Sequence, residues 1–124
     1  MKHLLTYSVI FILCALLVFP GCSHHHRTSV SISESDTKYT IVASFDQRIT
    51  TKIDRCMNRY LTGRNNMSFV NTRIDGQLTL DDKTTFYINK HPGVLEIEFN
   101  KGDNPSRSYD QIKALGEGLK AEIR

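Results

Sequence analysis

The spacing of hydrophobic residues predicts two amphipathic helices. Between Gln47 and Leu61, apolar residues recur every three or four positions, as they do on one face of a helix. The second apolar stripe runs from Tyr109 to Ile123, and Ser108 with Gln111 at its start has the spacing of a capping box. Asp46 precedes the first helix and Gly63 follows it, which are typical start and stop residues. Each helix therefore has one face to bury.

Alternating apolar and polar residues predict strands elsewhere in the chain. Tyr39–Phe45 and Val94–Phe99 alternate with period two, so the second places Glu96 and Glu98 on a wet face. Shorter segments at Gln77–Leu80 and Thr84–Asn89 are separated by polar turns, and Asp75-Gly76 has the sequence of a hairpin turn. The order strand, helix, three strands, helix favours an α+β two-layer sandwich: a mostly antiparallel sheet of about four strands with two helices on one face.

The N-terminal region has a different pattern. One lysine, Lys2, precedes an almost uninterrupted apolar run of 16 residues, 4–19. A helix that crosses a bilayer needs about 20 residues, so the run is better suited to a secretory signal than to a membrane anchor. An uncleaved N-terminal anchor and a secreted form that is cut elsewhere are the alternatives.

Gly21-Cys22, just after this run, resembles the end of the lipobox of bacterial lipoprotein signal peptides. The resemblance covers only the first 23 residues, and the rest of the chain resembles no known family. It implies cleavage after Gly21, a diacylglyceryl thioether on Cys22 and acylation, such as palmitoylation, of the new N-terminus. Ser23 stands where retained inner-membrane lipoproteins often carry aspartate, so the resemblance implies the outer membrane, with the domain facing the periplasm.

This interpretation divides the chain into three parts. Residues 1–21 form the signal peptide, 22–37 a polar tether and 38–124 a single domain. Val30 and Ile32 alternate with serines, which also allows a short edge strand inside the tether. The adjacent histidines 24–26 lack the fixed geometry of a metal site, and we expect no metal and no cofactor. The lone body cysteine, Cys56, is predicted to be a small buried side chain.

Charge gives one candidate binding surface. The formal net charge of the 124 residues is +3, a value that argues neither for nor against a nucleic-acid partner. Because an exported protein rarely meets nucleic acid, we expect no nucleic-acid partner. Within the first helix, however, the cations are spaced by three or four residues and form a basic stripe without glutamates to neutralise it: Arg48, Lys52, Arg55 and Arg59. Its candidate partners are anionic lipid headgroups, lipopolysaccharide phosphates or an acidic protein surface. The alternative is an ordinary solvated helix face.

The sequence contains no catalytic motif for nucleotide binding, serine hydrolysis or zinc proteolysis. Two weaker combinations stay open for an enzyme: a Glu96/Glu98 carboxylate pair and a Cys56/His91 nucleophile pair. Turn chemistry explains the acidic residues near the hairpins, Asp75, Asp81 and Asp82, better than a cation site does.

Together these observations predict a small lipid-anchored envelope protein that acts as a binding or structural module and is not an enzyme. Two alternatives belong to other classes. One is an enzyme or enzyme accessory that acts on cell-wall or lipid material. The other is a protective lipoprotein that blocks a toxin, a phage or a conjugation partner.

Overall fold

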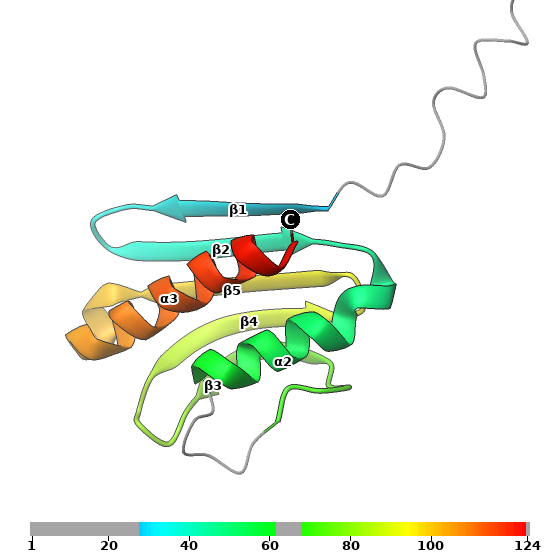
Figure 1. Cartoon of the computed structure of the whole chain (residues 1–124). Coiled ribbons are helices and arrows are strands. Elements are labelled where there is room, and N and C mark those ends of the chain that lie inside the picture. Colours follow the sequence, from blue (N-terminus) through cyan, green and yellow to red (C-terminus); the bar gives the residue numbers. More distant parts are fainter. Residues whose placement is uncertain (1–27, 62–67, 124) are drawn as a thin grey trace, which may run out of the picture.

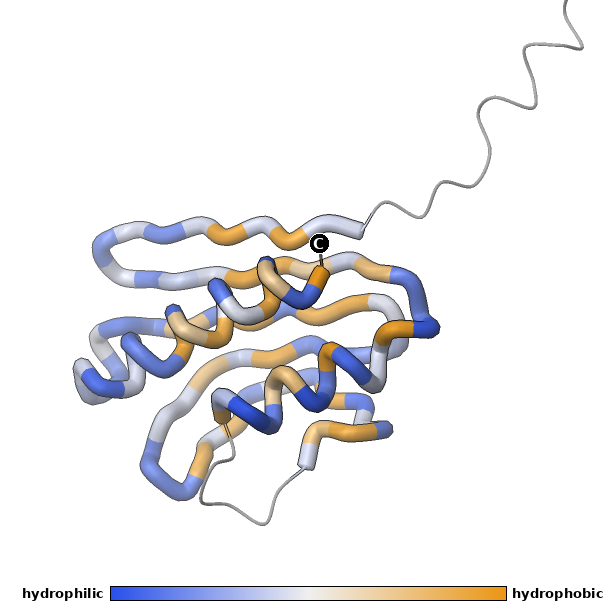
Figure 2. The backbone as a smooth tube through the Cα atoms, viewed as in Figure 1, coloured by the Kyte–Doolittle hydropathy of each residue, from blue (hydrophilic) through white to orange (hydrophobic). Residues whose placement is uncertain are grey.

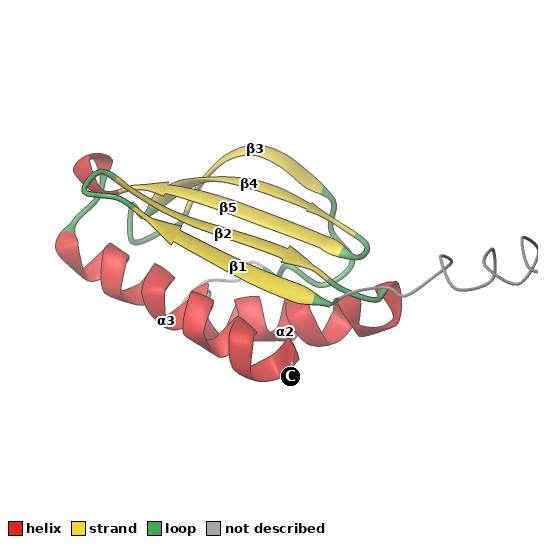
Figure 3. Cartoon of the chain, turned by 90° about the horizontal axis from the view of Figure 1, so that it is seen from above, coloured by secondary structure: helices red, strands yellow, loops and turns green. Residues whose placement is uncertain are grey.

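The computed structural model describes residues 28–61 and 68–123. Its sheet has five strands in the order β1-β2-β5-β4-β3, and all neighbours are antiparallel. The strands are β1 (Ser29–Glu34), β2 (Lys38–Ser44), β3 (Ile74–Thr79), β4 (Thr85–His91) and β5 (Val94–Asn100). The helices are α2 (Thr50–Leu61) and α3 (Ser106–Ile123), with short 3-10 turns η2 (Gln47–Ile49) and η3 (Lys101–Asp103). Both helices cover the same face of the sheet, so the predicted α+β two-layer architecture is confirmed (Figures 1 and 3).

The sheet has five strands, whereas about four were predicted. The additional strand is β1, which falls inside the segment predicted as a tether. Its six residues pair with β2 from Ser29 opposite Ser44 to Glu34 opposite Tyr39. Val30 and Ile32 pack partly buried against the core. Serines alternate with Val30 and Ile32 in β1, and this pattern is compatible with an edge strand as well as with a linker.

Hydrophobic positions alternate along the strands as the sequence predicts (Figure 2). Leu95, Ile97 and Phe99 of β5 are completely buried beneath the helices, and Glu96 and Glu98 lie on the open face. The predicted apolar stripes of both helices face this core. The fully buried apolar residues of the helices are Ile53, Cys56, Met57 and Leu61 of α2 and Ile112, Leu115 and Leu119 of α3.

Two local predictions were wrong. Gly76 lies within β3, opposite Ile88, and the turn between β3 and β4 is formed by residues 80–84, where Lys83 has a positive φ of 70°. The last helix begins at Ser106, directly after Pro105, and not at the Ser108 capping box. Ser108 is buried inside the helix, where its hydroxyl lies 2.7 Å from that of Thr84.

Candidate functional site

The predicted basic stripe lies on the exposed side of η2 and α2. Arg48, in η2, is bound to Asp46: its Nε and Nη2 donate to the carboxylate at 3.1 and 2.8 Å. The same carboxylate accepts the backbone N–H of Arg48, so Asp46 is the predicted N-terminal cap. The hydrogen bond with Asp46 raises the pKa of Arg48 above its ordinary value.

A carboxylate from the other helix partly neutralises the stripe. Glu122 of α3 lies 3.5 Å from the Lys52 ammonium and 3.5 Å from the Arg59 guanidinium. The spacing of glutamates within α2 does not reveal this contact, because Glu122 comes from α3, which is distant in sequence and adjacent only in the fold. Among the described residues, Arg55 has no acidic partner, so it is the cation of the stripe that is most available to an anion.

A buried ion pair, which sequence reasoning missed, joins α2 to β4. Asp54 and Lys90 have side chains that are 1% and 4% exposed, and Asp54 Oδ1 lies 3.0 Å from Lys90 Nζ. This oxygen accepts no hydrogen bond in the part of the chain that is described, so the contact is an ion pair alone. Lys90 Nζ also donates to the backbone oxygen of Thr72 at 2.6 Å. A signal was present in the sequence, since Lys90 continues the inward alternation of Phe86 and Ile88.

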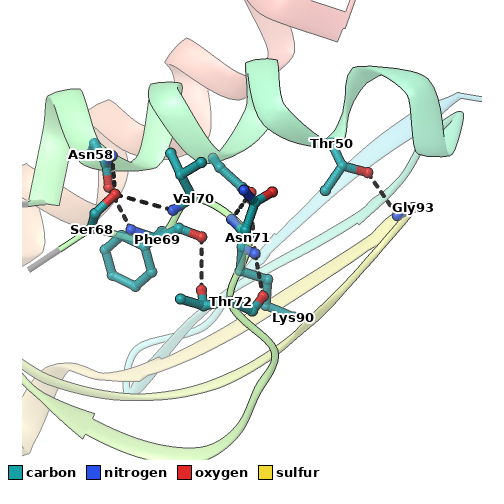
Figure 4. A network of polar contacts seen from close by, with 10 residues as sticks. Thr50, Asn58, Ser68, Phe69, Val70, Asn71, Thr72, Lys90 and Gly93 are labelled. Atoms are coloured by element: carbon teal, nitrogen blue, oxygen red, sulfur yellow. Dashed lines mark hydrogen bonds and ion pairs between the residues drawn. The ribbon is translucent and has the colours of Figure 1, made fainter.

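The ion pair is part of a network that holds residues 68–72 beneath α2 (Figure 4). Asn58 accepts the backbone N–H of Phe69 at 2.8 Å and donates to Ser68 at 3.0 Å. Asp54 Oδ2 accepts the backbone N–H of Asn71, whose φ is 59°, at 3.3 Å. These contacts fix the described residues that precede β3.

A hollow of about 200 Å³ lies beside this network. Its walls are Thr50, Asn71, Thr72, Arg73 and Pro92, together with the Asp54 and Lys90 pair. Ligand pockets usually measure about 300 to 1,000 Å³, so this hollow is small for an organic substrate. Because Lys90 is buried, is ion-paired with Asp54 and donates a hydrogen bond to the Thr72 carbonyl oxygen, we interpret it as a structural contact between α2, β4 and the segment before β3.

The two residue combinations considered for an enzyme are not assembled into a site. Glu96 and Glu98 lie on the open sheet face, and Glu98 Oε1 is 2.6 Å from Lys38 Nζ. Cys56 is completely buried, and burial raises the pKa of its thiol. His91 follows the outward alternation of β4, so the sheet separates it from Cys56.

The open face of the sheet is polar and carries Asp75, while Asp81 and Asp82 lie in the turn between β3 and β4. Cross-strand neighbours place Thr40, Glu98 and Tyr87 in one row. The Tyr87 hydroxyl donates a hydrogen bond to Asp75 Oδ1 at 2.7 Å, so this carboxylate is paired with a tyrosine of the neighbouring strand. In the turn between β3 and β4, Asp82 accepts the backbone N–H of Thr84. Val42, with 43% exposure, is the exposed large hydrophobic residue of the described chain.

The predicted lipidation and cleavage residues, Gly21 and Cys22, and the three histidines of the tether lie outside the described residues. Within residues 28–61 and 68–123, no helix is long and apolar enough to cross a membrane. The same residues contain no group of three or more histidine, cysteine, aspartate or glutamate side chains that could hold a metal ion.

Comparison of the chain with protein-family models, curated proteins and solved structures finds no match.

Proposed function

We propose that this protein is a lipid-anchored lipoprotein of the bacterial envelope whose α+β domain acts as a binding module at the outer membrane. The observation that carries the proposal is the apolar run with Gly21-Cys22 just after it, shortly before a folded domain. One acyl chain holds a protein to a bilayer weakly, whereas two or more hold it stably. A triacylated Cys22 would therefore keep the domain at the membrane.

The basic stripe of α2 is the surface we propose for an anionic partner. The exposed fractions of the side chains are 88% for Arg48, 56% for Lys52 and 63% for Arg59, so a partner could reach all three. Glu122 competes with such a partner for Lys52 and Arg59. The geometry therefore supports binding of an anion that can displace or bypass this carboxylate, and Arg55 offers the first contact.

The test of anchoring is membrane fractionation of the wild type beside Cys22→Ala. We expect the wild type in the outer-membrane fraction and resistant to extraction by salt. The Cys22→Ala variant should leave that fraction or keep its signal peptide, because the acceptor of the diacylglyceryl group is gone. Equal retention of both proteins, each with the same mature N-terminus, would contradict lipid anchoring.

The test of the stripe uses a gain of binding. Glu122→Gln should increase binding to lipopolysaccharide or to anionic vesicles several-fold, because it releases Lys52 and Arg59 from their carboxylate. Glu117→Gln is the matched control: Glu117 is exposed on the same helix and lies in none of the ion pairs of the described chain. Equal binding by the two variants would remove the stripe from the proposed function.

A further inference from the structure

The strand β1 leaves only a short link between the proposed lipid and the folded domain. Six residues, 23–28, lie between Cys22 and Ser29, where β1 begins, so the link spans seven steps from one residue to the next. At no more than about 3.6 Å per residue, this link reaches at most about 25 Å. The predicted tether of residues 22–37 would have reached about 55 Å at the same rise. The domain therefore stays closer to the bilayer than the sequence alone suggested.

The structure also keeps β1 in place, so the link does not lengthen easily. All six residues of β1 pair with β2. At the end of the strand, Glu34 accepts hydrogen bonds from Tyr109 and from Lys101, the latter at 2.7 Å. Peeling β1 from the sheet would break these bonds and expose Val30 and Ile32, which pack against the core.

The chain leaves the domain at one end of the sheet, which we call the exit end. It consists of the start of β1, η2 with its cap Asp46 and the first turn of α2, Arg73 with the start of β3, the β4–β5 turn and the last turn of α3 (Figures 1 and 3). Thr28 and Ser29 share a hollow with Lys120 and Ile123. Phe45 donates its backbone N–H to the Gly93 carbonyl oxygen, and Gly93 donates to Thr50 Oγ1, which joins the other segments of this end.

Charge differs between the two ends of the sheet. The described exit end carries four cations and two acids: Arg48, Lys52, Arg73 and Lys120, with Asp46 and Glu122. The opposite end, called the far end, consists of the β1–β2 and β3–β4 turns, η3 and the first turn of α3 (Figure 1). Counted with the adjoining ends of β1 and β2, its acids outnumber its cations: Glu34, Asp36, Asp81, Asp82 and Asp103 against Lys38, Lys83, Lys101 and Arg107.

We infer that the exit end faces an anionic bilayer surface, with Arg48, Lys52, Arg73 and Lys120 toward the lipid headgroups. This inference rests on the proposed lipid anchor, which brings the exit end within the reach of the short link. The negative potential of an anionic surface extends over about one Debye length, roughly 10 Å at 0.1 M salt, so it acts on this end first. It attracts the exit end and repels the acidic far end, which selects one orientation of the domain.

The inference can be tested with fluorescent labels at two positions on α3. Ala121→Cys marks the exit end, and Ser106→Cys marks the far end; both residues are exposed. They are 15 residues apart, about 22 Å along a helix. Background labelling should be low, because Cys56 is completely buried and the Cys22 sulfur would carry the lipid. The full lipidated chain is reconstituted on vesicles with an energy acceptor on the lipid headgroups.

On phosphatidylglycerol vesicles, we expect energy transfer from position 121 to exceed that from position 106 by at least two-fold. The excess should shrink in 1 M salt and on phosphatidylcholine vesicles, because screening or removal of the surface charge leaves only the link to orient the domain. Equal transfer from the two positions, or an excess that neither change affects, would overturn the inference. Both labelled proteins keep every charged residue of the wild type, so these comparisons do not depend on the folding of any charge variant.

Two charge variants locate the effect. Replacing the four exit-end cations by glutamine should abolish the excess on phosphatidylglycerol. The matched control removes the same formal charge from elsewhere by replacing Lys38, Lys83, Arg107 and Lys113 with glutamine, and it should keep the excess. Loss of the excess in the control alone would overturn the inference. If the wild type fails to stay on vesicles of either lipid, the lipid anchor itself fails, and the inference fails with it.

Discussion

At the scale of single residues, Gly116 shows why a residue that weakens helices stands inside α3. A Cβ atom at this position would lie 2.7 Å from the Tyr39 hydroxyl and 3.0 Å from Ile32 Cδ1. The absence of a side chain therefore allows α3 to approach β1 and β2 closely.

Gly116→Ala should destabilise the protein even though alanine favours helices. Overpacking a buried site costs about 1 to 3 kcal/mol, and the gain in helix propensity is about 1 kcal/mol. We expect a net loss of about 1 kcal/mol in the free energy of unfolding, measured by urea unfolding. Gly118→Ala is the control, because its close neighbour is the ring end of Tyr60, which is only partly buried and can rotate. A larger loss at Gly118 would contradict this explanation.

The buried Asp54 and Lys90 pair gives a second prediction at this scale. Lys90→Met should lower the free energy of unfolding by about 3 to 5 kcal/mol, because it leaves the Asp54 carboxylate buried without its cation. Asp54→Leu combined with Lys90→Met should recover much of that loss, since hydrophobic pairs often replace buried ion pairs at little cost. Urea unfolding of the two variants measures the difference. A double variant as unstable as Lys90→Met would show that the network has another role.

At the scale of elements, β1 is held by a polar cluster at its end. Glu34 accepts from Lys101 and Tyr109, and these hydrogen bonds lower the pKa of the Glu34 carboxyl. The bond to Glu34 raises the pKa of Tyr109 to about 12. A raised pKa means that the protonated hydroxyl is stabilised in the folded state. This contribution is therefore complete below pH 10 and is lost as the pH rises toward 12.

Alkaline titration should detect this contact. We expect one tyrosine to ionise near pH 12, after the others, and Tyr109→Phe to remove that last step. Amide exchange in β1 should accelerate over the same range of pH relative to β4, because ionised Tyr109 repels Glu34. Ultraviolet absorbance of the phenolate measures the first effect. Ionisation of all tyrosines in a single step near their ordinary pKa would contradict the proposed role of the cluster.

The elements also show what the sequence could predict. Periodicity located both helices and the buried faces of β2 and β5, because each buries a regular stripe. It did not settle β1, whose alternating serines suit either an edge strand or a linker. Asp75-Gly76 is a local turn signal, but pairing with β4 places Gly76 inside a strand. Likewise, Glu122 neutralises Lys52 through a contact between helices that no local spacing encodes.

At the scale of the whole molecule, the sheet connects anchoring with orientation. Because β1 belongs to the sheet, the same strand that completes the fold also shortens the link to Cys22. The exit end is basic and the far end is acidic, so the domain has a charge asymmetry along the direction in which the chain leaves it. The open face of the sheet and the stripe of α2 run along the sides between these ends.

The most direct test of the account is the intact mass of the mature protein extracted from envelopes. We predict a chain that begins at Cys22 and carries the added mass of a diacylglyceryl group and an N-terminal acyl chain. A mature protein that begins at any other residue, or that carries no acyl mass, would contradict the lipid anchor and the orientation that depends on it.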